Sequence, residues 1–493
     1  MQVPQQDEDD QRPQIPKSLR YSLKVSDSVH ANRKLVAYRA ENAAVFNPSD
    51  VVRMNISGGE AFLDLKNSTL SFDLANTTTT DSQWLDGGAS CVISSIRVLS
   101  KSGRQLDYVN NYNLISCILD QYNSNQSSMY SDDVLKGSAA RLDNSPWMAS
   151  TVMSTTGTSA QTLPTGQVFT ASAALAGNLT VANPNGGQGY TQTQATILGT
   201  GISRHFDLPL NGLGWMNPTL GKLLPPNTPF QLEITLATAT QALTRVSGSA
   251  TQAFTCQNFQ LKVPTISVRD VEFSESLRRS MSNNISWSTT SFVHNSGTTA
   301  SGAGSDTLQL AIKARDLRGI ISCFRTNSDI SLATAFQNSR RSIQPISSYQ
   351  YQIGSQHYPP TRVSLSTDTT AGGTAAGSRI RIGATAGYNI SEAYAEVLRL
   401  FRSLSTDVGT CVIGGESYGQ SSLNNGTGVI AVDVSSFTDK AVSSGLNTES
   451  GALQVSLEFI KTAAANATLA VDSFALVGVV YVRTPDGDVS MIV

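Results

Sequence analysis

The fold class of this 493-residue chain is decided by two stretches of sequence, Phe230-Gln231-Leu232-Glu233-Ile234-Thr235-Leu236 and Leu453-Gln454-Val455-Ser456-Leu457-Glu458-Phe459. Apolar and polar residues alternate in both, which is the period of a β-strand with one face in a core and the other toward solvent. The stretches lie about 220 residues apart, the size of one elaborated β-sandwich. They therefore predict a β-rich protein in which one type of sandwich occurs twice.

Two further pairs of segments accompany these stretches in the same order. His205 to Leu210 matches Val429 to Val434 in pattern, and Asn258 to Val263 matches Ser473 to Gly478. Few residues are identical, and any two β-domains give some chance matches of alternating strands. The agreement of three strands in order and spacing nevertheless favours a duplicated sandwich over chance.

Other segments also read as short elements. Period-two alternation or β-branched runs predict further strands over Ala61–Lys66, Leu70–Leu74, Cys91–Leu99, Leu308–Ile312, Ser348–Ile353 and Ser473–Val482. Lys101-Ser102-Gly103-Arg104 predicts a hairpin turn. Apolar residues at helical spacing predict short helices over Asn113–Tyr122 and Ser391–Leu404.

These elements divide the chain into an arm and two domains. Residues 1–20 are charged and rich in Pro and Gln, which is typical of an arm outside any core. We expect a first β-sandwich over 21–265 and a second over 266–493. Residues 148–200 are dominated by Ser, Thr, Gly, Ala and Gln, and they predict a surface insertion in the first domain.

The composition excludes several functions. Charged residues make up only 15%, against an average near about 25%. With 35 basic and 37 acidic residues the formal net charge is −2, and a protein that wraps nucleic acid needs a cationic excess. We therefore expect no direct sequence-specific binding of nucleic acid. The N-terminus has no apolar signal region, and the run Phe474 to Val482 is too short to span a bilayer.

The cysteines give no sign of a redox or metal site. They are odd in number, scattered, and without a Cys-x-x-Cys pair: Cys91, Cys117, Cys256, Cys323 and Cys411. Most of them neighbour apolar residues, so we expect small buried thiols, which suit a reducing compartment.

Residues with catalytic or metal-binding chemistry are few. No two histidines lie at i, i+4 spacing, and none neighbours a zinc-type cluster: His30, His205, His294 and His357. No nucleophile elbow, Walker A motif or dinucleotide-binding glycine motif occurs, and Leu223 follows Gly221-Lys222 where a P-loop needs Ser or Thr. We therefore predict no catalytic, cofactor-binding or metal-binding residue, no cofactor and no enzymatic activity.

Three charged motifs have a structural and a functional reading. Asp486-Gly487-Asp488 hints at calcium, but Pro485-Asp486-Gly487 is first of all a turn. Asp7 to Asp10 is read as a solvated terminus rather than a catalytic carboxylate pair. Arg278-Arg279 and Arg340-Arg341 lack interleaved aromatic residues, so inter-subunit salt bridges explain them as well as nucleic acid does.

Three groups of segments carry a resemblance to a known family. They are Ala61–Leu65 with Leu70–Phe72, Leu85–Gly88, Ile96–Ser100 and Asn111–Leu114; Leu224-Pro225-Pro226 followed by Phe230–Leu236; and Ser347-Ser348-Tyr349-Gln350-Tyr351-Gln352-Ile353-Gly354-Ser355-Gln356-His357-Tyr358-Pro359-Pro360. With these, the chain resembles the double jelly-roll major capsid proteins of double-stranded DNA viruses, of the virophage and polinton-like virus type. The insertion over 148–200 does not match the family.

The resemblance implies an all-β fold of two tandem jelly-roll β-sandwiches with short helices in loops. It implies a homotrimer with a pseudo-hexagonal outline that tiles an icosahedral shell and resides in the virion. The implied partners are neighbouring capsomers, penton and minor capsid proteins, and an internal membrane beneath the shell. The arm over residues 1–20 is our candidate for reaching under the shell or onto a neighbouring capsomer.

Two other classes of protein remain as alternatives. A β-sandwich receptor- or glycan-binding protein, such as a spike or lectin, would usually show repeats or aromatic sugar platforms, and the four tryptophans are widely spread: Trp84, Trp147, Trp215 and Trp287. A β-rich carbohydrate-active enzyme would need paired carboxylates facing a cleft. Oligomer size separates these readings, because a stable trimer favours the capsid protein.

Overall fold

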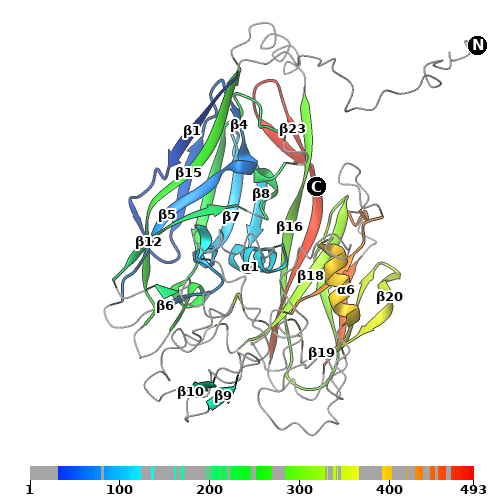
Figure 1. The fold of residues 1–493 in the computed structure, drawn as a ribbon. Coiled ribbons are helices and arrows are strands. Elements are labelled where there is room, and N and C mark those ends of the chain that lie inside the picture. Colours follow the sequence, from blue (N-terminus) through cyan, green and yellow to red (C-terminus); the bar gives the residue numbers. More distant parts are fainter. Residues whose placement is uncertain are drawn as a thin grey trace, which may run out of the picture.

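The computed structural model of the chain describes a β-rich protein with two sandwiches side by side (Figure 1). The described residues are 31–78, 83–123, 135–137, 160–162, 168–170, 197–198, 201–210, 212–218, 222–245, 251–268, 284–327, 330, 337–339, 341, 343, 346–365, 391–401, 418, 428–436, 445–449, 454–461 and 468–492. The predicted arm over 1–20, most of the insertion over 148–200, and His30, Arg278, Arg279, Arg340 and Cys411 lie outside them.

The first sandwich consists of two antiparallel sheets. One sheet has the order β1 (Ala31–Arg39), β15 (Phe254–Val268), β5 (Thr69–Asn76) and β12 (Ser203–Pro209), and the short strands β2 (Val45–Phe46) and β4 (Phe62–Leu63) also pair with β15. The other sheet has the order β3 (Val51–Ile56), β13 (Phe230–Leu236), β7 (Ile93–Ser100) and β8 (Gln105–Asn110).

The second sandwich is built in the same way. One sheet has the order β16 (Ile285–Thr299), β23 (Leu469–Arg483), β18 (Leu317–Thr326) and β21 (Ile430–Asp433), with β24 (Val489–Ile492) paired to the end of β23. The other has the order β17 (Gly304–Leu310), β22 (Val455–Lys461), β19 (Ile346–Ile353) and β20 (Gln356–Ser364).

Both sandwiches share one strand order. Numbered one to eight along the chain, the principal strands pair as 1-8-3-6 in one sheet and 2-7-4-5 in the other. This arrangement of two Greek keys is a jelly roll. The predicted fold class is therefore confirmed. The predicted repeat is confirmed as well, because β12, β13 and β15 hold the same three positions as β21, β22 and β23.

Strand β13 shows why the alternating pattern gives this structure. Its core-facing side chains are at most 3% exposed: Phe230, Leu232, Ile234 and Leu236. Burying each contributes about 1.5–3 kcal/mol. On the opposite face, Glu233 contacts Arg53 of β3 at 3.0 Å and Arg97 of β7 at 3.8 Å. The apolar face thus fixes the register, and cross-strand charges reinforce it.

Two predicted strands are shorter than the sequence pattern suggested. The prediction over Ala61–Lys66 was wrong beyond β4, because β4 pairs with only two residues of β15 and the chain then turns into the 3₁₀ helix η3 (Leu65–Asn67). Cys91 and Val92 belong to the 3₁₀ helix η4 (Ala89–Val92), so the strand begins at Ile93. Both 3₁₀ helices bury apolar side chains, as a strand at the same place would, so the apolar pattern alone does not distinguish the two structures.

The helices lie in connections between strands. The predicted helix over Asn113–Tyr122 is confirmed as α1 (Tyr112–Asn123), and α6 (Ser391–Leu400) ends four residues before the predicted Leu404. Two shorter elements are α4 (Ala239–Ala242) and the 3₁₀ helix η7 (Gly214–Met216). Figure 1 shows α1 beside β16, where the two sandwiches face each other.

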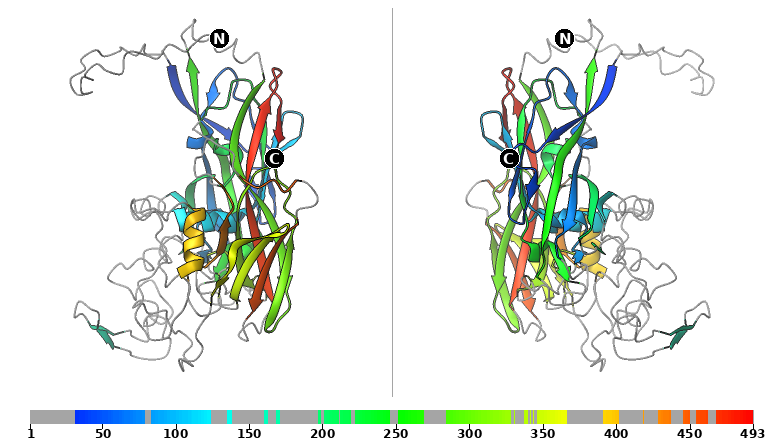
Figure 2. Two further views of the ribbon diagram at one scale, coloured as in Figure 1. Left: turned by 90° about the vertical axis from the view of Figure 1, so that its right-hand side faces the viewer. Right: turned by 90° about the vertical axis from the view of Figure 1, so that its left-hand side faces the viewer.

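Two small sheets complete the described structure. Strands β11 (Ile197–Leu198) and β14 (Leu243–Arg245) flank β6 (Gln83–Leu85), and β9 (Ala160–Thr162) pairs with β10 (Val168–Thr170) inside the predicted insertion. The side views in Figure 2 show β9 and β10 well away from both sandwiches. The start of β1, the end of β15 and the start of β16 all lie toward the opposite end of the molecule (Figures 1 and 2).

Candidate functional site: the junction between the sandwiches

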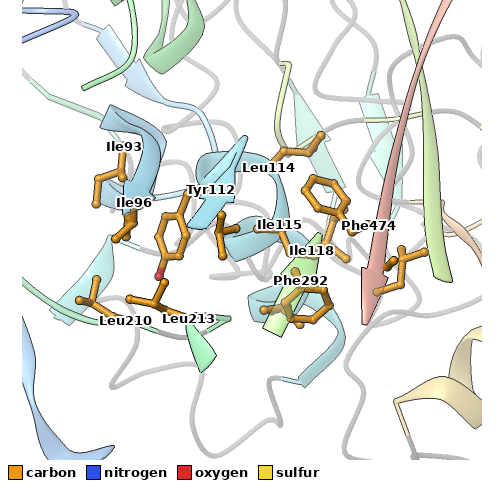
Figure 3. Close-up of a cluster of buried hydrophobic side chains, with 14 of the residues drawn as sticks. Ile93, Ile96, Tyr112, Leu114, Ile115, Ile118, Leu210, Leu213, Phe292 and Phe474 are labelled. Atoms are coloured by element: carbon orange, nitrogen blue, oxygen red, sulfur yellow. The ribbon is translucent and has the colours of Figure 1, made fainter. Parts of the chain in front are cut away.

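The junction between the two sandwiches combines a continuous apolar core with several buried clusters of polar side chains. A single cluster of buried apolar side chains continues from one sandwich into the other. Figure 3 shows Phe292 and Phe474 of the second sandwich beside Leu114, Ile115 and Ile118 of α1. An interface of this kind resembles a domain core rather than a transient contact, so we expect the two sandwiches to move as one body.

A second apolar contact lies nearer the end where β16 begins. The Trp215 ring of η7 is 5.8 Å from the Trp287 ring of β16 and 4.9 Å from the Tyr481 ring of β23, measured between centroids. On the other side of the junction, Tyr122 of α1 stacks on Phe401 at 5.2 Å. Large rings add offset or edge-on contacts of about 0.5–1.5 kcal/mol each to the burial of their area.

Asp472 of β23 is the centre of one buried polar cluster. Its carboxylate accepts hydrogen bonds from Arg325 Nη2 at 2.6 Å, His294 Nε2 at 2.8 Å and Asn111 Nδ2 at 3.0 Å. Asn111 belongs to the first sandwich, where it precedes α1 in a left-handed backbone conformation (φ 50°) that asparagine tolerates. Asn110 Nδ2 lies 3.5 Å from His294 Nδ1 on the same side. This cluster therefore ties the two sandwiches together.

The ionised form of Asp472 is strongly favoured. Burial by itself raises the pKa of this carboxyl, but the charge of Arg325 and the hydrogen bond from His294 outweigh burial and hold the pKa at about 2. Side-chain exposure is 4% for Asp472 and 11% for Arg325, so the ion pair is shielded from solvent. Neither residue can be neutralised without leaving the other charge buried.

Asp86 makes a second connection across the junction. This carboxylate, 1% exposed, accepts from the backbone N–H groups of Gln337, Asn338 and Ser339 and from the Ser339 hydroxyl, at 2.5 to 3.0 Å. Bonds from several donors to one carboxylate are charge-assisted and short. They anchor the segment 337–339 of the second half onto the first sandwich.

Arg341 continues this connection. Its guanidinium is fully buried and donates to Gln121 Oε1 on α1 and, at 2.6 Å, to the carbonyl of Asn338. Gln121 Nε2 in turn donates to the Ser339 carbonyl at 3.1 Å. The structure supports neither reading of Arg341, as a partner in inter-subunit salt bridges or as a nucleic-acid contact, because the side chain is enclosed by the molecule's own junction.

Asp107 of β8 links η7 to β16. It accepts from the Ser291 hydroxyl at 2.6 Å and from the Trp215 backbone N–H at 3.0 Å. Complete burial raises the pKa of this carboxyl, although these hydrogen bonds act in the opposite direction. The Thr289 hydroxyl also donates to the Gly214 carbonyl at 2.9 Å. The bonds from Ser291 and Thr289 span the two sandwiches, whereas the bond from Trp215 lies within the first.

The acidic turn Asp486-Gly487-Asp488 also lies at the junction. Asp488 accepts from the Ser102 hydroxyl of the β7–β8 turn at 2.8 Å, and Asp486 accepts from Thr484. The predicted turn is confirmed, with Gly487 at φ +87°. Within the described ranges, no group of three His, Cys, Asp or Glu side chains is placed to hold a metal ion.

His205 lies in an arrangement that resembles a catalytic triad on the outer face of the first sandwich. Its Nδ1 is 2.5 Å from Asp73 Oδ1, and its Nε2 is 2.9 Å from Ser71 Oγ. Ser71, however, is fully buried, and its neighbouring backbone groups belong to the ladders of β5 with β12 and β15. A hydroxyl buried to this extent is not accessible to a substrate. The cluster stabilises the β5–β12 pair.

The remaining predicted residues have structural surroundings. Cys91, Cys117, Cys256 and Cys323 are buried free thiols, as predicted. Burial raises the pKa of Cys117 and of Cys323 to about 12, so both are unreactive thiols at neutral pH. His357 is an exposed residue of β20. Among the residues that the structure describes, no helix is long and apolar enough to cross a membrane.

The sequence analysis assigned no role at the junction to any of these residues. A carboxylate inside an apolar run, such as Asp472 in Leu469-Ala470-Val471-Asp472-Ser473-Phe474, is the one available signal, because a charge there needs a buried partner. The partners themselves lie far away in sequence, and no pattern names them.

Comparisons with known proteins show where this fold occurs. No protein-family model matches the chain, and no curated protein matches it. A quasi-atomic model of the PBCV-1 virus capsid matches with a TM-score of 0.55 and 10% identity over 94% of this chain and 97% of the other. The Sputnik virophage structure matches with a TM-score of 0.53 and 9% identity over 100% and 92%. The Faustovirus major capsid protein matches with a TM-score of 0.53 and 9% identity over 92% and 90%. Over almost its whole length, the chain thus has the double jelly-roll fold of virus capsid proteins such as these.

Proposed function

We propose that this protein is a major capsid protein that trimerises into pseudo-hexagonal capsomers and tiles an icosahedral virus shell. One observation carries the proposal. Two jelly rolls of identical strand order stand side by side in one chain, fixed to each other by a buried junction. The shared fold with the PBCV-1 capsid and the Faustovirus major capsid protein supports it.

The geometry explains why such a chain suits a shell. Three copies of a subunit with two similar sandwiches bring six sandwiches around one axis, which gives a six-sided outline. That outline is constant only if the two sandwiches of each subunit keep one orientation. The clusters around Asp472, Asp86 and Asp107 would hold that orientation, since each spans the junction with directional hydrogen bonds.

The proposal assigns a structural part to each range of the chain. Residues 21–265 form the first jelly roll and 266–493 the second, while residues 1–20 form an arm and 148–200 a surface insertion. Neighbouring capsomers, penton proteins and minor capsid proteins are the partners, and a membrane beneath the shell is a further one. The protein acts in the virion, is made inside the host cell and has no enzymatic role. The net charge of −2 supports contact with proteins rather than with nucleic acid.

Light scattering after size-exclusion chromatography, with negative-stain imaging, tests the proposal. The expected result is a particle of about three times 52.4 kDa with a six-sided outline. Curved sheets of such particles at high protein concentration would support the shell. A monomer that does not assemble would contradict the proposal and favour a β-sandwich receptor- or glycan-binding protein, which a glycan screen would then test.

A further inference from the structure

A small apolar pocket lies in the seam between the two sandwiches. The first sandwich contributes Leu65, Trp215 and Leu224, and the second contributes Ile285 and Trp287. The exposed residues Lys222 and Ser286 also line the pocket and mark its opening to solvent. The cavity measures about 60 Å³. Pockets for small-molecule ligands usually measure about 300–1,000 Å³, so this cavity fits a single apolar side chain rather than a cofactor.

Two polar groups at the pocket lack the partners that they would be expected to have. The indole N–H of Trp215 is buried and has no acceptor among the described residues. This N–H has almost no accessible surface, so it does not serve as a donor to an incoming group. Lys222 has no carboxylate within ion-pair distance in the described part of the chain, and Lys66, next to Leu65, has none either. The pocket therefore suits an acidic peptide with one apolar anchor.

The chain itself contains such a peptide before β1. Residues 7–16 read Asp-Glu-Asp-Asp-Gln-Arg-Pro-Gln-Ile-Pro, which places four acidic residues shortly before Ile15. The 16 residues from Ile15 to His30 can extend by up to about 50 Å. β1 starts at the end of the molecule where β16 begins, and β16 supplies Ile285 and Trp287 to the pocket (Figures 1 and 2). The arm is long enough to reach this seam.

We propose that the N-terminal arm docks into this pocket, with Ile15 as the apolar anchor and Asp7 to Asp10 facing Lys222. The docking also rests on the proposed function in one respect: in an assembled capsomer, the pocket that an arm fills can belong to a neighbouring copy. Such an exchange of arms would link subunits through a contact that leaves the sandwiches unchanged.

Photo-cross-linking in the full-length protein tests this docking. An aliphatic diazirine amino acid replaces Ile15, and mass spectrometry identifies the peptides that it labels after irradiation. The expected cross-links lie in 215–225 or 285–287. We expect Lys222→Glu to lower their yield by about threefold or more at low salt, since like charges then face each other. Lys101→Glu is the matched control, because this exposed lysine does not line the pocket, and its yield should equal that of the parent protein.

Two results overturn the docking. Cross-links confined to other segments, or none above an unirradiated sample, exclude Ile15 as the anchor. Equal yields with and without Lys222→Glu exclude the pairing with the acidic stretch. Bands of twice the monomer mass on a denaturing gel assign the pocket to a neighbouring copy, and monomer bands assign it to the same chain. The cross-linking can be measured without assembled shells. A trimer without the expected cross-links would contradict the docking but not the proposed capsid function. A monomer with the expected cross-links would contradict the capsid function but not the docking.

Discussion

Replacing Asp472 by Asn tests whether the junction stabilises the whole molecule. The substitution keeps the shape of the side chain but removes the charge that faces Arg325 at 2.6 Å. Each pKa unit corresponds to about 1.4 kcal/mol, so the fall of the pKa from 3.8 to about 2 favours the ionised carboxylate by roughly 2.5 kcal/mol. Leaving a buried guanidinium without its carboxylate raises the expected loss to about 3–5 kcal/mol.

The assay is guanidinium unfolding followed by both tryptophan fluorescence and circular dichroism. Asp472→Asn, Arg325→Met and the double variant form a double-mutant cycle. We expect the loss in free energy of unfolding of the double variant to be about 2 kcal/mol smaller than the sum of the two single losses. Glu449→Gln, which removes an exposed ion pair with Arg315, serves as the control, and its unfolding midpoint should stay unchanged. Strictly additive losses in the cycle would refute the coupling of Asp472 to Arg325.

The same carboxyl gives a pH dependence of known sign. Because its pKa is lower in the folded than in the unfolded chain, its contribution is complete above about pH 4 to 5 and is lost as pH falls through about 2. The stability difference between the parent protein and Asp472→Asn should therefore be constant at neutral pH and shrink between about pH 4 and pH 2. A difference that grows on acidification would contradict the assignment of the charged form.

Three further predictions concern the junction and the core. Asp86→Asn turns an amide N–H toward the backbone N–H groups of the segment 337–339, and we expect a loss of about 2–4 kcal/mol in guanidinium unfolding; an unchanged midpoint would show that the segment is not anchored there. Gly214→Ala places a methyl group 2.7 Å from the Thr290 carbonyl oxygen, and we expect a loss of about 1–3 kcal/mol by the same assay. Four thiols should resist iodoacetamide in the native protein and react only after denaturation, as peptide mapping would show: Cys91, Cys117, Cys256 and Cys323. Labelling of any of them in the native state would contradict their burial.

The sequence by itself determined the fold class and the repeat. Stretches such as Phe230–Leu236 and Leu453–Phe459 can be recognised as strands from their own residues, because the two-residue period of a half-buried strand is a local property. The long strand β16 escaped detection, since Ser and Thr occupy much of it and weaken the apolar alternation. The end of β4 was misjudged because the length of a strand depends on the partner available to it, here two residues of β15.

Only the tertiary structure decided how the two sandwiches are joined. Asn111 and Asp472, or Asp86 and Asn338, meet across separations of 361 and 252 residues. Local patterns cannot name such partners, since a carboxylate in an apolar run signals the need for a donor but not where that donor lies. Arg341 shows the same limit: its sequence neighbours suggest a solvated charge, and only the packing of α1 against the segment 337–341 makes it a buried one. Local periodicity therefore determines the elements, whereas the junction depends on which distant polar groups burial brings together.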